Sequence, residues 1–381
     1  MRTNLIFDEY CTESERVVKM ILPVNYEDKF AYNIYIEEDF VALKEAIRTL
    51  ELHTVKYCII SDSNVSSLYQ HKVQSVLSEL SDKVVNISFT AGEASKNLDT
   101  VSTIYKFLIK HKFDRNDILV ALGGGVVGDL CGYVAASYLR GLRFIQIPSS
   151  LLAQADSSIG GKTGVDFMSY KNIIGAFHMP SLVYSNIDTL KTLSSVEFAS
   201  GMAEIVKSAI IKDRFFFDLL EYKADKIKAK DSFTCMDMLF RADSIKKAVV
   251  EEDPKEKSAR ALLNFGHTLG HAIEKELNFK LSHGQCVALG SCAAADISMK
   301  RYLISSNEKK RIENLFNIFD LDNKLRYNID IEAVLKATLN DKKMSSGKIK
   351  FILINSIGEA FIDDSVSMEE MREGLKSIIY E

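Results

Sequence analysis

The sequence contains no stretch of about eighteen consecutive apolar residues, which is roughly what a helix needs to cross a bilayer. The first residues also lack the charged start, apolar run and small-residue cleavage site of a secretory signal. We therefore expect no membrane span and a cytoplasmic protein.

The sequence has no paired cysteines of the Cys-x-x-Cys kind. Its six cysteines are scattered along 381 residues. In so long a chain, this distribution fits reduced thiols better than a disulfide framework or a zinc ribbon.

An excess of charge of one sign is also missing. The 48 Lys and Arg residues nearly balance the 52 Asp and Glu residues, and the net charge is -4. Such a chain has no strong field for nucleic acid or an anionic membrane, so we expect neither partner. Any anionic ligand must be met by cations placed locally.

The length and the change of pattern along the chain predict two domains. Before residue 190, strand-like runs (55–61, 84–89, 118–122, 144–147) alternate with helix-length segments (65–80, 97–112, 127–139). This alternation is typical of an α/β domain with a parallel-type sheet. After residue 190, helical periodicity dominates to about 320, and a hairpin is expected over 348–354 and 360–363. We expect an α/β domain over 1–190, a mostly helical domain over 191–381, and a ligand site between them.

A polar stripe stands out in the second half. Its members are spaced by four, three, four and three residues, which places them on one face if a single helix runs through them. Apolar residues fill the other faces, so we expect a buried helix whose polar edge faces a cavity. Desolvating such groups is costly unless they meet a charge, a metal or a ligand, and the alternative is a set of satisfied core histidines. The stripe comprises Arg260, Asn264, His267, His271 and Glu274.

A glycine-rich turn lies in the first half. Gly123, Gly125 and Gly128 fit the G-x-G-x-x-G spacing between a strand-like and a helix-like segment. This arrangement lets a pyrophosphate approach the positive end of a helix, although a turn that only packs a helix on a sheet is the alternative. The acidic residue expected about twenty residues later is missing. We expect the ribose to be held elsewhere, with Asp62, Asn64, Glu93 and Lys96 as candidates.

A second glycine-rich stretch follows the next strand. Ser149 and Ser150 come directly after that strand, where open α/β sheets usually bind ligands. Charged and amide side chains then recur among small and apolar residues, which favours a binding segment over a solvated loop. These side chains belong to Asp156, Lys162, Lys171 and Asn172.

A helix is expected to begin at the Ser194 and Glu197 capping box. On it Glu204 and Lys207 share a face, either as an ordinary surface ion pair or as part of a site.

Three of the seven histidines lie between positions 267 and 283, which suggests a divalent metal, with zinc the most common choice. From spacing alone, His267 and His271 form an i, i+4 pair that His283 or Glu204 completes.

At this point the residues resemble a known family. The motifs GGGVVGD, PSSLLAQADSSIGGKTGVD, KNIIGAF, GMAEIVK, LLNFGHTLGHAIE and SHG occur in the order and spacing of the 3-dehydroquinate synthases of the shikimate pathway. Together they cover roughly residues 62–290. The resemblance implies an N-terminal NAD-binding α/β domain, a C-terminal helical metal- and substrate-binding domain, and a metal between them, usually zinc and sometimes cobalt.

The resemblance also assigns roles to residues. It implies Glu204, His267 and His283 as the metal ligands, which leaves His271 for the substrate. It implies a homodimer in which Arg140 reaches across the interface. The implied cofactor contacts are Asp62, Asn64, Glu93, Lys96, Gly124, Gly125, Val126, Asp129, Ser149, Ser150, Lys162, Lys171, Thr189, Leu190 and Thr192. The implied catalytic and substrate residues are Arg140, Asp156, Lys162, Asn172, Lys207, Lys246, Glu256, Arg260, Asn264 and His271.

The implied reaction converts 3-deoxy-D-arabino-heptulosonate 7-phosphate to 3-dehydroquinate and phosphate through transient oxidation by NAD+. Lys162, Lys246 and Arg260, with Lys342 or Lys343, would supply positive charge for the substrate's carboxylate and phosphate. Asn264 and His271 are expected to hold the phosphate, whose own oxygen acts as the base.

A few positions depart from the family pattern. Ser149 and Ser150 stand where threonines are common, Gln285 replaces a frequent glutamate, and Ser258 replaces a glycine. None of these changes removes an implied metal ligand.

Three alternative functions share parts of this pattern. A related cyclase making a deoxyinosose or valiolone skeleton has the same implied fold and metal, but the GGKTGV and KNIIGAF segments follow the dehydroquinate type. A metal-dependent polyol dehydrogenase would share the glycine-rich turn and the helical metal domain. A non-catalytic NAD- or metal-sensing module would bind both ligands without turnover.

Overall fold

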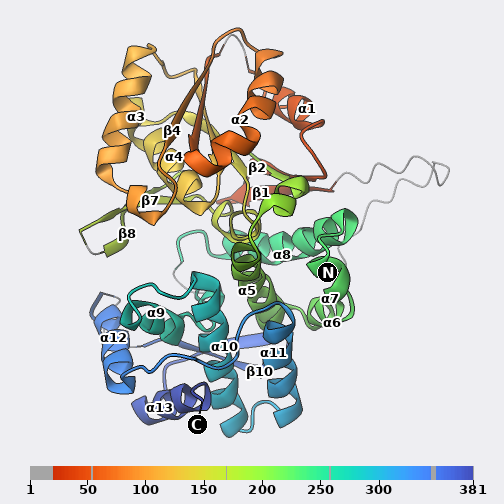
Figure 1. The fold of residues 1–381 in the computed structure, drawn as a ribbon, viewed down its shortest axis with the longest axis vertical. Helices are drawn as coiled ribbons and strands as arrows, with labels where there is room; N and C mark the ends of the chain where they lie inside the picture. Colours follow the sequence, from red (N-terminus) through yellow and green to blue (C-terminus); the bar gives the residue numbers. More distant parts are fainter. Residues whose placement is uncertain (1–19, 53–54, 169, 257–258, 345–348, 381) are drawn as a thin grey trace, which may run out of the picture.

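The computed structural model consists of a sheet-containing half and a helical half joined side by side (Figure 1). It describes residues 20–52, 55–168, 170–256, 259–344 and 349–380. Among these residues, none of the helices combines the length and apolar composition needed to cross a bilayer.

The first half is built on a seven-stranded sheet with the order β1-β2-β9-β6-β5-β3-β4. Its central strands are buried on both faces, as is usual when helices cover both sides of a parallel sheet. The strands are β1 (Met20–Tyr26), β2 (Lys29–Glu37), β3 (Tyr57–Asp62), β4 (Val84–Phe89), β5 (Ile118–Gly123), β6 (Arg143–Pro148) and β9 (Leu182–Asn186).

The predicted parallel sheet is confirmed for the six strands from β2 to β4 in this order, but not for the edge strand β1. β1 pairs antiparallel with β2 through a tight turn in which Glu27 and Asp28 have φ of 50° and 61°. Neither residue is a glycine, so this stretch carries no clear turn signal, and β1, β2 and β9 were not among the predicted strands.

Helices cover both faces of this sheet. Asp62 begins α2 by accepting hydrogen bonds from the backbone of Asn64 and Val65, and Asn97 caps α3 in the same way. The helical segments are α1 (Leu43–Arg48), α2 (Ser63–Ser78), η1 (Glu93–Ser95), α3 (Leu98–Lys110), α4 (Gly125–Ser137), η2 (Tyr138–Arg140), η3 (Ala153–Ser157) and η4 (Ile187–Thr192).

The second glycine-rich stretch forms a hairpin that projects from this half (Figure 1). Its strands are β7 (Lys162–Phe167) and β8 (Tyr170–Phe177). Gly175 has to be a glycine there, because a Cβ at this position would lie 2.3 Å from the carbonyl oxygen of Thr163. These two segments are therefore regular strands and not a loop, although most side chains of β8 are exposed to solvent.

The second half is mostly helical, as predicted. Its helical segments are α5 (Ser195–Lys212), α6 (Arg214–Tyr222), α7 (Ala224–Lys228), α8 (Ser232–Glu252), η5 (Ala259–Asn264), α9 (His267–Glu276), α10 (His283–Lys300), α11 (Ser306–Ile318), α12 (Ile331–Met344) and α13 (Met368–Ser377). The expected late hairpin is present as β10 (Phe351–Ser356) and β11 (Glu359–Asp363).

The single helix predicted from Arg260 to Glu274 is wrong. The chain forms η5, turns at Gly266 with φ of 77°, and only then begins α9. The turn brings the chain against α10 so closely that a Cβ on Gly266 would lie 2.3 Å from Ser291 Oγ. Close packing of two backbones therefore outweighs the helical periodicity of the sequence.

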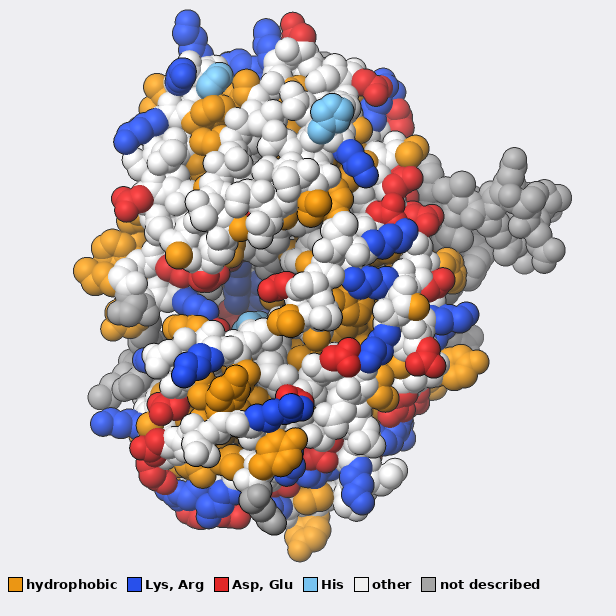
Figure 2. Space-filling model, viewed as in Figure 1, with side chains coloured by type: hydrophobic (Ala, Val, Ile, Leu, Met, Phe, Trp, Pro, Cys, Tyr) orange, Lys and Arg blue, Asp and Glu red, His pale blue; other side chains and the backbone are white. Residues whose placement is uncertain are grey.

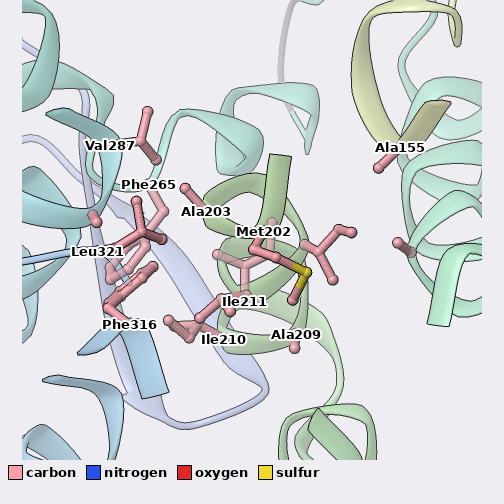
Figure 3. Close-up of a cluster of buried hydrophobic side chains, with 14 of the residues drawn as sticks. Ala155, Met202, Ala203, Ala209, Ile210, Ile211, Phe265, Val287, Phe316 and Leu321 are labelled. Atoms are coloured by element: carbon pink, nitrogen blue, oxygen red, sulfur yellow. The ribbon is translucent and has the colours of Figure 1, made fainter. Parts of the chain in front are cut away.

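The core of the helical half surrounds α5 (Figure 3). Met202, Ala203 and Ile210 of this helix are fully buried, with Phe265 and Phe316 from neighbouring segments. The same apolar cluster continues into β1 and β2 of the sheet, where α8 packs on β1. The halves therefore share a core along one side, which positions their facing surfaces.

Candidate active site

A cavity of about 1240 Å³ lies between the two halves. Figure 2 shows the hollow, with basic, acidic and histidine side chains visible inside it. Its upper wall consists of segments at the carboxyl ends of β3, β5 and β6, where open α/β sheets usually bind ligands. Its lower wall comes mainly from α9 and the start of α10.

The glycine-rich turn borders this cavity. β5 ends at Gly123, Gly124 is the N-cap of α4, and the helix begins at Gly125. A Cβ on Gly125 would lie 3.2 Å from Ser157 Oγ, so a side chain would crowd the opening. The turn presents the amino end of a helix to the cavity, which suits a pyrophosphate.

Most of the expected cofactor residues line the cavity. Leu190 is instead buried in the apolar core, and Lys162 is exposed outside the cavity lining. The residues that line it are Asp62, Asn64, Glu93, Lys96, Gly124, Gly125, Val126, Asp129, Ser149, Ser150, Lys171, Thr189 and Thr192.

Lys96 ties three segments together at the cavity wall. Its ammonium group donates hydrogen bonds to Asp129 Oδ2 at 2.7 Å and to Asn172 Oδ1 at 2.5 Å. Burial alone would lower the pKa of Lys96, but the charge and hydrogen bond of Asp129, together with the nearby carboxylates of Glu93 and Asp166, raise it. Lys96 is therefore a charged group that fixes Asp129 and Asn172 in place.

Gln154 is a positioning residue that the sequence did not reveal. It is fully buried on η3, and its Nε2 lies 3.1 Å from Pro148 O, 3.0 Å from Asn186 O and 3.1 Å from Thr189 Oγ1. It thus joins the ends of β6 and β9 to Thr189, which lines the cavity. The only signal was a polar residue between small residues in AQADS, and that pattern does not identify its partners.

Four donor groups for a metal converge at the other side of the cavity. Glu204 Oε1, on α5, lies 3.4 Å from His267 Nε2 and 3.2 Å from His283 Nε2. His271, one turn after His267 on α9, completes the group, and one ligand atom from each histidine lies within 4.8 Å of the others. Imidazoles with one carboxylate fit zinc or a similar divalent ion.

The structure brings together both sets of ligands that the sequence left open. The set Glu204, His267 and His283 and the set of three histidines share the same small volume. His271 is the most exposed of the three rings and lines the cavity, which leaves it accessible to a substrate.

Burial and neighbouring charges act in opposite directions on the pKa values of Glu204 and His283. Burial would raise the pKa of Glu204, but the charge of Lys207 and the contact with His267 outweigh it and lower the pKa. Burial would lower the pKa of His283, yet its contacts with the carboxylates of Glu204 and Glu274 raise it to about 9. Burial, followed by the two neighbouring imidazoles, lowers the pKa of His271, so its ring is neutral near pH 7.

Glu204 and Lys207 are not a surface pair. Both side chains are buried, at 3% and 2% exposure, and they contact each other directly. A buried ion pair is costly to form unless further partners satisfy it, and here the histidines supply those partners for Glu204. The surface alternative for this pair is therefore wrong.

Further basic groups lie behind the cavity wall around Asp156. Lys246 is buried on α8 and contacts Asp156, and burial lowers the pKa of Lys246. Arg260 is 3% exposed and donates to Pro254 O at 3.0 Å. A Cβ on Gly160 would lie 2.6 Å from Arg260 Nη2, so this glycine leaves room for the guanidinium group.

Many expected catalytic and metal-binding residues do not line the cavity themselves, namely Glu204, Lys207, Lys246, Arg260, His267, Lys162, Glu256, Asn264 and Arg140. Lys162 and Glu256 form an ion pair, Asn264 ends η5 and is half-buried, and Arg140 is exposed on η2. The side chains of Lys342 and Lys343, and Ser258, lie outside the described part of the structure.

Comparison with protein families covers most of the chain. Residues 86–200 match the model described as 3-dehydroquinate synthase N-terminal, and residues 201–344 match the C-terminal model. A 3-dehydroquinate synthase from Acetivibrio thermocellus is 43% identical over 90% of this chain and 96% of its own length. Another from Ruminiclostridium cellulolyticum is 40% identical over 89% of this chain and 93% of its own.

Solved structures show the same architecture. A 2-epi-5-epi-valiolone synthase from Streptomyces hygroscopicus, with NAD+ and Zn2+ bound, is 25% identical, covers 94% of this chain and 99% of its own, and has a TM-score of 0.84. An iron-containing alcohol dehydrogenase shares the fold at a TM-score of 0.62 and 12% identity over 94% of this chain and 99% of its own. From the two family models and the sequence relatives, the chain belongs to the 3-dehydroquinate synthase family.

Proposed function

We propose that the chain converts 3-deoxy-D-arabino-heptulosonate 7-phosphate to 3-dehydroquinate and phosphate. One observation carries this proposal: a single cavity is lined by a nucleotide-type glycine turn and by His271 and His283, which belong to a group of four metal donors. A reaction that oxidises and later reduces the same carbon needs both elements within reach of one substrate. NAD+ and a divalent metal, zinc or cobalt, are its cofactors.

The upper wall holds the cofactor. The amino end of α4 faces the pyrophosphate, and Asp129 is fixed beside it by Lys96. Thr189, held by Gln154, and Thr192, held by Tyr69, border the opposite side. NAD+ bound there stores a hydride between the oxidation and the reduction.

Glu204, His267 and His283 hold the metal. When bound, a divalent ion polarises a substrate hydroxyl and lowers its pKa, which favours its oxidation. Lys207, together with His267 and His283, lowers the pKa of Glu204 against the effect of its burial.

The substrate's anionic groups require cations, which the chain as a whole does not supply. Lys162, Lys246 and Arg260 provide them. Asn264 and a neutral His271 donate hydrogen bonds to the phosphate, and a phosphate oxygen removes the proton from C6. The phosphate then leaves, the C5 ketone is reduced, and the ring closes by an aldol addition.

We also propose a cytoplasmic homodimer whose subunits divide into domains at 1–190 and 191–381. The support for a dimer is the β7–β8 hairpin, whose apolar side chains are exposed. Phe167 is 43% and Phe177 50% exposed, and Figure 2 shows an apolar patch at this edge of the molecule. Arg140 and Leu139 are exposed on η2 of the same half. In the dimer Arg140 reaches the partner's substrate.

The test follows inorganic phosphate and NADH together in a mixture of zinc-loaded protein, NAD+ and the heptulosonate phosphate. We expect phosphate to rise while NADH stays flat, and we expect a chelator or His283→Ala to abolish the release. NADH rising with product would indicate a polyol dehydrogenase instead. No change in either signal would leave a related cyclase, tested with other sugar phosphates, or a binding module.

A further inference from the structure

We propose that Glu274 is a positioning residue that connects the cofactor half of the molecule to the metal site. Glu274 orients the His283 ring through the ring nitrogen that faces away from Glu204. Lys171, from the opposite half, contacts the same carboxylate of Glu274. This inference rests on the proposed function, because it takes His283 as a metal ligand.

The first contact joins Glu274 to the Nδ1 atom of His283. Glu274 Oε2 is 3.6 Å from His283 Nδ1, while Glu204 Oε1 is 3.2 Å from His283 Nε2. The two ring nitrogens are thus divided between two carboxylates, and only Nε2 faces the other metal donors. A carboxylate at the remote nitrogen of a metal-binding histidine fixes its tautomer and orientation and makes it a stronger ligand.

The second contact crosses the cavity. Lys171 Nζ, on β8, lies 3.0 Å from Glu274 Oε1 and 4.2 Å from the centre of the Phe279 ring. Figure 1 shows the β7–β8 hairpin above α9. The ammonium group of the sheet half therefore lies between a carboxylate and an aromatic ring of the helical half, both favourable for a cation.

Glu274 is well placed to respond to both partners. Its side chain is only 10% exposed. Its two carboxylate oxygens are divided between Lys171 and His283. A buried ionised carboxylate between two donors divides its hydrogen-bonding capacity, so a stronger contact with one leaves less for the other.

Lys171 has a second use, because it also lines the cofactor cavity. When NAD+ recruits Lys171, Glu274 loses one partner and turns more fully to His283. Bound NAD+ should therefore tighten metal binding, and by thermodynamic reciprocity the metal should tighten NAD+ binding. This arrangement favours assembly of the site only when both cofactors are present.

The test measures zinc affinity by competition with a coloured chelator, without turnover. We expect Glu274→Gln to weaken zinc binding about 10- to 100-fold, the usual effect of removing such a carboxylate. The visible spectrum of the cobalt-loaded variant should also change, and Glu274→Asp, which keeps the charge, should restore part of the affinity. Glu276→Gln on the same helix is the matched control and should bind zinc normally.

A second variant tests the crossing contact. In Lys171→Met, zinc affinity should already be high without NAD+ and should no longer respond to saturating NAD+, whereas Lys280→Met should behave as the parent protein does. Normal zinc affinity and an unchanged cobalt spectrum in Glu274→Gln would overturn the proposal. If His283→Ala also bound zinc normally, the metal site of the proposed function would fail, which is a distinguishable result.

Discussion

Asp243 is the most unusual single residue outside the site. It is fully buried on α8, and neither carboxylate oxygen has a hydrogen-bond partner among the described residues. Burial raises its pKa well above the ordinary value of 3.8, more than the nearby Lys246 lowers it. The folded protein therefore holds the proton of Asp243 to a higher pH than the unfolded chain does, so its stability depends on pH.

We predict that Asp243→Asn stabilises the protein at neutral and alkaline pH. Because the folded pKa of Asp243 is raised, the contribution of this group to the free energy of unfolding is fully present below pH 3.8. That contribution is lost as the pH rises toward and through the folded pKa. Each tenfold change in the ionisation constant on folding corresponds to about 1.4 kcal/mol of stability, and the amide is free of this loss. Denaturant unfolding at several pH values should show an advantage that is smallest near pH 4 and grows upward. An advantage independent of pH would contradict this account.

A second prediction concerns Gln154. Gln154→Leu removes the donor that holds Thr189, so we expect KM for NAD+ to rise about five- to tenfold, in line with a hydrogen bond worth about 1 kcal/mol. Zinc affinity should change little. Gln285→Leu is the matched control, because Gln285 also bonds backbone groups, at Asp322, but does not line the cofactor cavity. Equal effects of the two variants on KM would contradict a positioning role.

The residues of the site that belong to sequence motifs could be predicted, whereas contacts between residues far apart in the sequence could not. Glu204 and the three histidines were identified from their motifs, and the structure brings them together. The contact of Lys171 with Glu274 was not predicted, because it joins residues 103 positions apart. The local periodicity of a sequence cannot predict a contact between residues so far apart. The partners of Gln154 on β9 and η4 could not be predicted for the same reason.

At the scale of elements, four strands of the sheet were predicted from their β-rich runs. The strand expected over 84–89 is β4 (Val84–Phe89), and the other three lie within two residues of their predicted ends. The β1–β2 edge, the buried strand β9 and the β7–β8 hairpin were missed. The β1–β2 turn has no glycine, and the glycines of β7–β8 serve close packing of the strands and do not mark the turn.

The break between η5 and α9 yields a prediction at this scale. Gly266→Ala places a Cβ against Ser291 in a left-handed backbone conformation. We expect a loss of stability of about 1–3 kcal/mol or more from the strain alone. Zinc binding should also weaken, because His267 begins α9 directly after the turn. Thermal unfolding and zinc titration measure the two effects, and a variant as stable as the parent would contradict the close packing.

At the scale of the whole molecule, two halves share a core along one side and face each other across the cavity elsewhere. Family motifs from both halves predicted two halves with different roles, an NAD-binding half and a metal-binding half. The shared core between β1, β2 and α8 was not foreseen. It arises because the first strands of the chain lie at the sheet edge nearest the helical half.

The proposed homodimer gives a prediction for the assembled molecule. Phe167→Glu places a charge in the exposed apolar hairpin, so we expect dissociation to monomers in sedimentation or light scattering. Phe215→Glu is the control, because Phe215 is 85% exposed on α6, away from the hairpin. A dimer that survives Phe167→Glu would place the interface elsewhere.

The central claim is that one cavity oxidises and reduces the same substrate and so regenerates its own cofactor. The most direct measurement gives the zinc-loaded protein much less NAD+ than heptulosonate phosphate and counts the phosphate released. The account predicts many phosphates for each NAD+, with the carbocyclic product accumulating and no lasting NADH. Phosphate release that stops at one per NAD+, or product formed only with matching NADH, would contradict it.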